Sequence, residues 1–238
     1  AEDGSTVTLV ITDSDGNEQT VTATVENGTY SVDAETPLSE GEYSVEASVT
    51  DPAGNTATSN DVGEIDASAP ALTVDAPALT SDTTPTIVGT TDAEDGSTVT
   101  LVITDSDGNE QTVTATVENG TYSVDAETPL SEGEYSVEAS VTDPAGNTAT
   151  SNDVGEIDAS APALTVDAPA LTSDTTPTIV GTTDAEDGST VTLVITDSDG
   201  NEQTVTATVE NGTYSVDAET PLSEGEYSVE ASVTDPAG

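Results

Sequence analysis

The stretch TVTLVITDSDGNEQTVTATVENGTYSVDA, residues 98–126, decides the fold of this chain. Val, Leu, Ile and Ala alternate with polar residues, mostly threonine, over 98–104 and 112–118, which is the two-residue period of a strand with one buried face. Two short polar segments interrupt the alternation. The second, ENGT at 118–121, holds the Asn-Gly pair that is typical of tight β-hairpins. The stretch therefore predicts consecutive antiparallel strands.

The same pattern continues on both sides of this stretch, and no segment shows helical periodicity over about ten residues. DPAGN at 143–147 places proline where a type I turn favours it. LSEGEYSV at 130–137 places Tyr135 where a tyrosine corner would bond to upstream backbone. Seven short strands in about 90 residues predict an immunoglobulin-like sandwich of two sheets. The expected strands are 71–75, 85–90, 98–104, 112–118, 121–126, 134–142 and 148–157.

An exact repeat with a period of 92 residues organises the whole chain, because every overlapping position is identical. We predict a partial repeat at 1–65 without its first two strands, a complete repeat at 66–157, and a repeat at 158–238 without its last strand. The expected fold is all-β, with tandem seven-stranded immunoglobulin-like sandwiches joined end to end. Binding and catalytic modules usually diverge after duplication, so identical copies favour a spacer array.

The charge of the chain excludes several functions. It has 48 Asp and Glu residues, no Lys, Arg or His, and a formal net charge of −48. Nothing in it could neutralise the phosphates of a nucleic acid, and an anionic membrane surface would repel it. No window of about 18 apolar residues predicts a membrane span. Such acidity often indicates disorder, but the alternation described above favours a folded chain, and the absence of cysteine excludes disulfides.

The acids gather in the loops at the two ends of the predicted sandwich and in the linker VGEIDASAP. The top end carries the loops around 91–97, 118–121 and 143–147, and the bottom end carries 105–109 and the loop before Gly133. Like charges 4 Å apart repel by about 4 kcal/mol at a surface-like dielectric. A raised pKa would relieve this repulsion, and so would calcium, which takes six to eight oxygen ligands from flexible loops.

These loops predict calcium sites, and the alternative for each acid is a solvated side chain. The candidate loops match no complete EF-hand, because the 12-residue spacing and the flanking helices are missing. The candidate calcium ligands are Asp13, Asp15, Asn17, Glu64, Asp66, Asp92, Glu94, Asp95, Asp105, Asp107, Asn109, Asp143, Glu156, Asp158, Asp184, Glu186, Asp187, Asp197, Asp199, Asn201 and Asp235.

Two stretches resemble a known family. PTIVGTTDAEDGSTVTLVITDSDG (85–108) and GTYSVDAETPLSEGEYSVEASVTDPAGNTA (120–149) look like the start and end of the bacterial immunoglobulin-like repeats of giant RTX-type surface adhesins, which include biofilm and ice-binding adhesins. The resemblance covers the entire chain. It implies extender modules outside a Gram-negative cell, exported by type I secretion and stiffened by calcium, with linker and top-loop ligands at Asp66, Asp92, Asp95 and Asp143. The Gly-rich RTX nonapeptides and a tip domain are missing from this sequence.

We therefore expect a calcium-stiffened extender that forms a monomeric rod and whose partners are neighbouring identical repeats. We expect no nucleic acid, no membrane contact, no small-molecule substrate and no enzymatic activity. The alternatives are a carbohydrate- or protein-binding adhesive module, and an acidic surface that serves hydration alone. A glycosidase would need paired carboxylates, for which Glu94 and Asp95 are the candidates, but no cleft is implied. The NGT triplets at Asn27, Asn119 and Asn211 match a glycosylation acceptor and are interpreted as hairpin turns.

Overall fold

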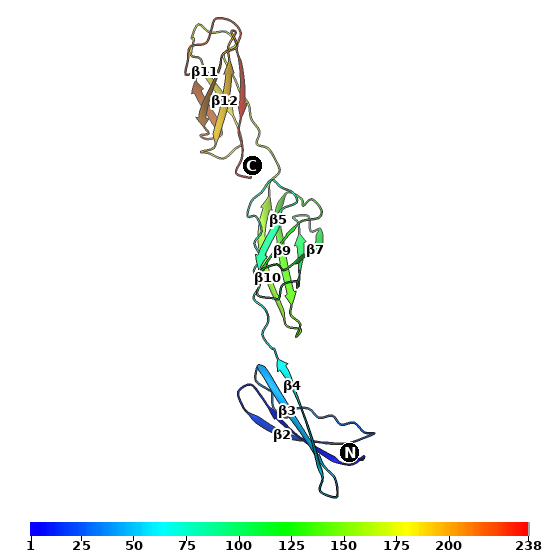
Figure 1. Cartoon of the computed structure of the whole chain (residues 1–238). Coiled ribbons are helices and arrows are strands. Elements are labelled where there is room, and N and C mark those ends of the chain that lie inside the picture. The colour runs from blue at the N-terminus through cyan, green and yellow to red at the C-terminus, as the bar shows by residue number, and fades with distance from the viewer. Residues whose placement is uncertain (238) are drawn as a thin grey trace. The chain divides into compact units, whose positions relative to one another are not determined.

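The computed structural model describes residues 1–237 and contains β-strands and no helix (Figure 1). No helix of this part of the chain could therefore cross a membrane. Two compact units are distinguished, residues 1–70 with 142–149, and residues 71–141 with the chain from 150 onward. The strands are β1 Thr6–Thr12, β2 Glu18–Thr24, β3 Gly41–Thr50, β4 Thr56–Ile65, β5 Thr86–Thr90, β6 Thr98–Thr104, β7 Glu110–Thr116, β8 Thr121–Asp125, β9 Gly133–Thr142, β10 Thr148–Ile157, β11 Thr178–Thr182, β12 Thr190–Thr196, β13 Glu202–Thr208, β14 Thr213–Asp217 and β15 Ser228–Ser232.

The middle repeat, 66–157, shows the predicted two sheets. One has the strand order β10-β9-β6-β7, and the other pairs β5 with β8. Because β6 pairs with β9 as well as with β7, sequence neighbours and distant strands share one sheet, as in immunoglobulin-like sandwiches. The strands predicted at 98–104 and 148–157 coincide with β6 and β10. The predicted all-β immunoglobulin-like fold is confirmed.

Two strand predictions differ from the structure by more than one residue at an end. The segment 71–75 joins β5 through two isolated bridges, Leu72 with Thr91 and Asp75 with Val88, and forms no continuous strand. The strand predicted at 112–118 runs over 110–116, because pairing with β6 resumes directly after the DSDGN turn, where Glu110 lies opposite Thr104.

The core of the middle repeat consists of the inward residues of the alternating strands. Val99, Leu101 and Ile103 on β6 are fully buried. Small aliphatic side chains dominate, and two tyrosines supply the aromatic surface, Tyr122 at 3% and Tyr135 at 1% exposure. Their alternation with exposed threonines fixes which face of each strand points inward.

Both tyrosines fasten the first segment of the repeat to the sandwich. The Tyr122 hydroxyl donates to Thr73 O at 2.5 Å, and the Tyr135 hydroxyl donates to Pro77 O at 2.9 Å. A side chain at Gly155 would lie 2.6 Å from the Tyr135 hydroxyl and 2.2 Å from Pro77 O, so only glycine leaves room for this contact. The Tyr135 hydroxyl does bond to upstream backbone, as expected, but its acceptor lies 58 residues upstream, in the first segment of the repeat, and not a few residues away as in a tyrosine corner.

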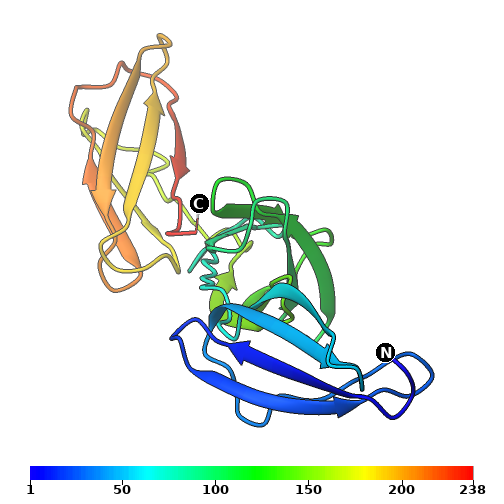
Figure 2. The same ribbon diagram turned by 60° about the horizontal axis from the view of Figure 1, so that its bottom comes forward.

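The first repeat shows how much a strand depends on its partner. Its strands form one sheet, β2-β1-β3-β4, seen side by side in Figure 2. Residues 29–33 have the same sequence as β8 but form no strand, since the first repeat has no equivalent of β5. Tyr30 is therefore 45% exposed, whereas the equivalent Tyr122 is buried. In the third repeat, β15 spans five residues, whereas its counterpart β9 spans ten.

Candidate functional site: the acidic hairpin loops

Two hairpin loops share the pattern Asp-x-x-Gly-Asn: DSDGN, which occurs in all three repeats, and DPAGN, which occurs at 51–55 and 143–147. In DSDGN of the middle repeat, Asp105 N donates to Asn109 O at 3.1 Å and Gly108 N donates to Asp105 O at 3.0 Å. The DPAGN loop at 143–147 closes with the same two bonds. Gly108 has a φ of 81°, the left-handed conformation that glycine adopts without strain. The two sequences therefore build one loop type.

The Asp105 carboxylate is surrounded by hydrogen-bond donors from its own repeat. One oxygen accepts from Asp107 N at 3.0 Å and Asn109 N at 2.8 Å. The other accepts from Asn109 Nδ2 at 3.0 Å, Ser131 N at 3.2 Å and Ser131 Oγ at 2.9 Å. Asp105 is only 8% exposed. The negative charge of this buried acid is thus compensated by N–H and O–H donors, in place of a cationic side chain.

These donors hold the pKa of the loop aspartates low. The Asn109 side-chain bond, against the opposing effect of desolvation, keeps the pKa of Asp105 well below its usual range. In the first repeat, the bond from the Asn17 side chain is the main cause that lowers the pKa of Asp13 to about 2. The Asn201 side chain lowers the pKa of Asp197 in the same way. Each of these acids is therefore ionised in the folded chain at neutral pH.

The aspartates of the DPAGN loops are held similarly but lie nearer to solvent. Asp143 accepts from Gly146 N at 2.8 Å and Asn147 N at 2.9 Å, and from Asn147 Nδ2 at 3.0 Å. The side-chain bond from Asn147 is the main cause that lowers the pKa of Asp143. Asn147 Nδ2 also donates to Asp66 O at 3.1 Å. The amide of Asn147 thus bridges an acidic loop and the linker segment within one compact unit.

Other acids of the top end tie loops together. Asp92 Oδ1 accepts from Ala71 N at 2.6 Å, and Asp95 Oδ1 accepts from Gly120 N at 3.3 Å. The third repeat repeats both bonds, from Ala163 N to Asp184 at 2.6 Å and from Gly212 N to Asp187 at 3.3 Å. The loops around 91–97 and 118–121 therefore share one end of the sandwich, as predicted.

The linker aspartates bond within the linker, and serines anchor it. Asp158 Oδ1 accepts from Ser160 N at 3.2 Å, and Ser160 Oγ donates to Glu132 Oε1 at 2.7 Å. The first linker repeats the anchor from Ser68 Oγ to Glu40 Oε1 at 2.7 Å. Asp158, like Asp66 in the first linker, is thus partnered by a donor two residues away.

The structure sorts the predicted ligands into three groups. The loop aspartates with at least four donor contacts are Asp13, Asp105 and Asp197, and their Asn partners are Asn17, Asn109 and Asn201. The acids with between one and three donor contacts from residues 1–237 are Asp66, Asp92, Asp95, Asp107, Asp143, Asp158, Asp184, Asp187, Asp199 and Asp235. The acids whose carboxylates show no hydrogen bond within residues 1–237 are Asp15, Glu64, Glu94, Glu156 and Glu186.

Within the described residues, no group of three or more acids lies close enough together to hold a metal ion. Most of the predicted ligands contact hydrogen-bond donors, and in residues 1–237 they do not cluster with other acids. Sequence reasoning missed this role of asparagine and of Ser131, although the shared Asp-x-x-Gly-Asn spacing was visible. Calcium binding therefore stays a prediction.

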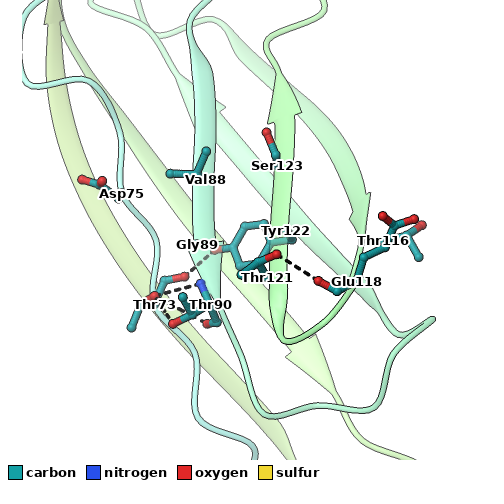
Figure 3. A pocket seen from close by; sticks show the side chains of 10 residues that line it. All are labelled: Thr73, Asp75, Val88, Gly89, Thr90, Thr116, Glu118, Thr121, Tyr122 and Ser123. Carbon is teal, nitrogen blue, oxygen red and sulfur yellow. Dashed lines mark hydrogen bonds between the residues drawn. The ribbon is translucent and has the colours of Figure 1, made fainter.

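An open groove lies on the outer face of the β5-β8 sheet (Figure 3). Its lining includes the hydroxyls of Thr73, Thr121 and Ser123 around Val88, which is 39% exposed. The equivalent residues of the third repeat form a second groove around Val180. Hydroxyls and one aliphatic side chain offer hydrogen bonds and a small apolar contact.

The comparisons with known proteins match this architecture. A family model described as a bacterial Ig-like domain matches residues 1–67, 71–159 and 163–238. The chain belongs to this family. In this bacterial Ig-like chain, the three matches leave out residues 68–70 and 160–162, which lie in the linker sequences. The resemblance seen in the sequence is thus confirmed.

Two solved structures are similar to this bacterial Ig-like chain. One is a tetra-tandem repeat in the extending region of a large adhesion protein, with 34% identity, 100% of this chain and 68% of that chain covered, and a TM-score of 0.40. The other is from a study of host cell surface retention of a 1.5-MDa bacterial ice-binding adhesin, with 25% identity, coverage of 91% and 76%, and a TM-score of 0.44. No curated protein matches.

Proposed function

We propose that this chain is an extender segment of a bacterial surface adhesin, which holds a binding tip away from the cell. The exact repetition of a whole Ig-like sandwich carries the proposal. An extender contributes length, and length adds up from interchangeable units, so identical repeats serve it well. The similarity to the extending region of a large adhesion protein supports the same role. The segment would act outside a Gram-negative cell after type I secretion, and the role needs no catalysis.

The length of the strands sets the expected size of each unit. Strands β9 and β10 have ten residues each. At a rise of about 3.3 Å per residue, a sandwich with its linker would add roughly 35–45 Å. Chains with different numbers of 92-residue repeats test this role by small-angle scattering. The maximum dimension should grow by this increment with each repeat, and a dimension that does not grow would overturn the extender proposal.

We also propose that calcium stiffens the array, supported by a net charge of −48 without any cationic side chain. The Asp105-type loop acids fit calcium poorly, because five donor contacts already occupy the Asp105 carboxylate. Asp66 and Asp92 fit better, because donors reach only one oxygen of each within the described chain. Calcium bound by such acids, by Glu94 and Asp95, or by their equivalents in the third repeat would neutralise the charge of the acids that bind it.

Scattering and thermal melting with calcium or chelator test the calcium proposal. Removal of calcium should shorten the average extension and lower the melting temperature. Metal bound only by the folded state adds about 2.7 kcal/mol per site at a 100-fold excess over Kd. The double variant Asp66→Ala/Asp158→Ala should weaken the response, and Asp105→Asn is its matched control. An unchanged chain on chelation would contradict calcium binding but leave the extender role standing.

The alternative function, a carbohydrate- or protein-binding module, is favoured by the recurring groove around Val88 and Val180. The exposed valine and its neighbouring hydroxyls could contact a sugar face. Binding of soluble polysaccharides to the chain and to its Val88→Asp/Val180→Asp variant tests this function. Binding of a polysaccharide to the parent chain, together with loss of that binding in the variant, would support the alternative.

A further inference from the structure

The ENGT segments form tight turns with unusual backbone angles. In the middle repeat, Glu118 N donates to Thr121 O at 2.9 Å and Thr121 N donates to Glu118 O at 3.1 Å. Asn119 and Gly120 have φ values of 52° and 74°, and two successive positive values define a type I′ turn. The interpretation of NGT as a hairpin turn therefore agrees with the structure.

The asparagines of these turns differ in two ways from those of the Asp-x-x-Gly-Asn loops. The side chains of Asn27, Asn119 and Asn211 are exposed and make no hydrogen bond within residues 1–237, and each precedes a glycine. By contrast, Asn109 and Asn147 donate through Nδ2 to an aspartate, and the residue after each is not glycine. The amides of the turn asparagines are thus free to react with the following backbone nitrogen.

We propose that Asn27, Asn119 and Asn211 are sites of spontaneous deamidation, and that Asn27 converts first. The glycine backbone nitrogen loses its proton to solvent and attacks Asn Cγ. The new N–Cγ bond closes a succinimide as the Cγ–Nδ2 bond breaks, and the amide nitrogen leaves as ammonia. Water then opens either carbonyl of the ring, which yields aspartate or isoaspartate. The reaction needs only water, and glycine favours it because no side chain crowds the attacking nitrogen.

The three identical sites differ in how firmly each turn is closed. Thr91 N donates to Gly120 O and Thr183 N donates to Gly212 O, both at 3.0 Å. In the first repeat, no N–H of the described chain donates to Gly28 O, and Gly28 is exposed whereas Gly120 and Gly212 are half-buried. The residues after the first turn also lack the strand that follows the other two, β8 or β14.

This difference predicts an order of reaction. In all three turns the glycine nitrogen donates to an aspartate, Asp3, Asp95 or Asp187, so attack requires a local opening of the turn. One additional hydrogen bond reduces the open population by about two- to tenfold. Asn27 should therefore react at least about twofold faster than Asn119 and Asn211, which should react at equal rates.

The products would alter the turn that they form in. Aspartate at position 119 adds a negative charge near Asp95, which already accepts a hydrogen bond from Gly120 N. Isoaspartate adds one atom to the main chain of a two-residue turn, which disturbs the register between the flanking residues. Deamidation would therefore loosen the hairpins as the protein ages.

Mass spectrometry of the full chain tests the proposal, but the three sites give identical peptides. Ser31→Thr and Ser215→Ala, at exposed positions, give each peptide its own mass. The chain with these two substitutions is incubated in mildly alkaline buffer, either folded or in urea. It is then digested with a protease that cleaves after glutamate. We expect faster conversion at Asn27 in the folded chain and equal rates in urea. If the unfolded chain converts while the folded chain stays unmodified, the fold protects the sites and the proposal is overturned. Equal rates at the three sites in the folded chain would overturn the order alone.

A matched pair of variants tests the role of the aspartate. Asp95→Asn keeps the shape of the hydrogen-bond acceptor of Gly120 N but removes a charge that opposes loss of the glycine proton. Asn119 should then react faster, while Asn211, whose partner Asp187 is intact, should keep its rate. Asp107→Asn, at the other end of the sandwich, serves as the control. An unchanged rate at Asn119 would contradict this role of the carboxylate.

Discussion

Removal of one hydroxyl, in Tyr135→Phe, measures how strongly the first segment is fastened to the middle repeat. The hydroxyl donates to Pro77 O at 2.9 Å, and the ring is 1% exposed. Burial raises the pKa of Tyr135 to about 12, so the hydroxyl stays protonated as a donor. The variant loses one hydrogen bond and leaves the Pro77 carbonyl without this donor. Together these effects cost about 1–2 kcal/mol.

Calorimetry of the full chain provides the assay. For a domain of this size, 1 kcal/mol corresponds to a shift of about 4–8 °C in melting temperature. Tyr43→Phe is the matched control, because Tyr43 has the same local sequence but no hydrogen bond from its hydroxyl within the described chain. The Tyr43→Phe substitution should change the melting temperature only slightly. Equal shifts in the two variants would refute the reasoning, because the loss would then come from the ring environment and not from the bond to Pro77.

Three further predictions follow from the same contacts. Gly89→Ala should strongly destabilise the middle repeat in urea unfolding, because the new carbon would lie 2.2 Å from Thr73 O; Val88→Ala on the outer face is the control and should be mild. Asn109→Ala should raise the low pKa of Asp105, whose main cause it removes, and an unchanged carboxylate titration by NMR would contradict this. The stability that Asp13 contributes is present above its unfolded pKa of about 3.9 and should be lost as pH falls toward about 2; Asp13→Asn should therefore differ from the parent at neutral pH and converge with it in acid.

Strands whose pattern and partner are both local could be predicted from the sequence. β6 and β10 have the predicted bounds, because each lies beside a strand joined to it by a short hairpin. Residues 29–33 mark the limit, since the same five residues form β8 when β5 lies beside them and form no strand in the first repeat. Alternation shows that a segment can form a strand, and a distant partner decides whether it does.

The candidate site was predictable in its location and less so in its chemistry. The acids do gather at the loops, but sequence spacing could not show that Ser131, 26 residues after Asp105, would donate two hydrogen bonds to it. The partners of Asp92 and Asp95, Ala71 N and Gly120 N, are backbone groups that no side-chain pattern reveals. A search of the sequence for oppositely charged side chains cannot identify donors that belong to the main chain.

The number of hydrogen-bond donors around each acid determines how much a bound cation would stabilise it. A carboxylate with several N–H and O–H donors, such as Asp105, already has its charge compensated at short range, and a metal would have to displace those donors. A carboxylate such as Glu94, with no donor in the described chain, interacts only with solvent and with neighbouring charges. Repulsion in a chain of charge −48 therefore falls chiefly on the acids with free oxygens, and calcium would relieve it there while the Asp-x-x-Gly-Asn loops stay folded without it.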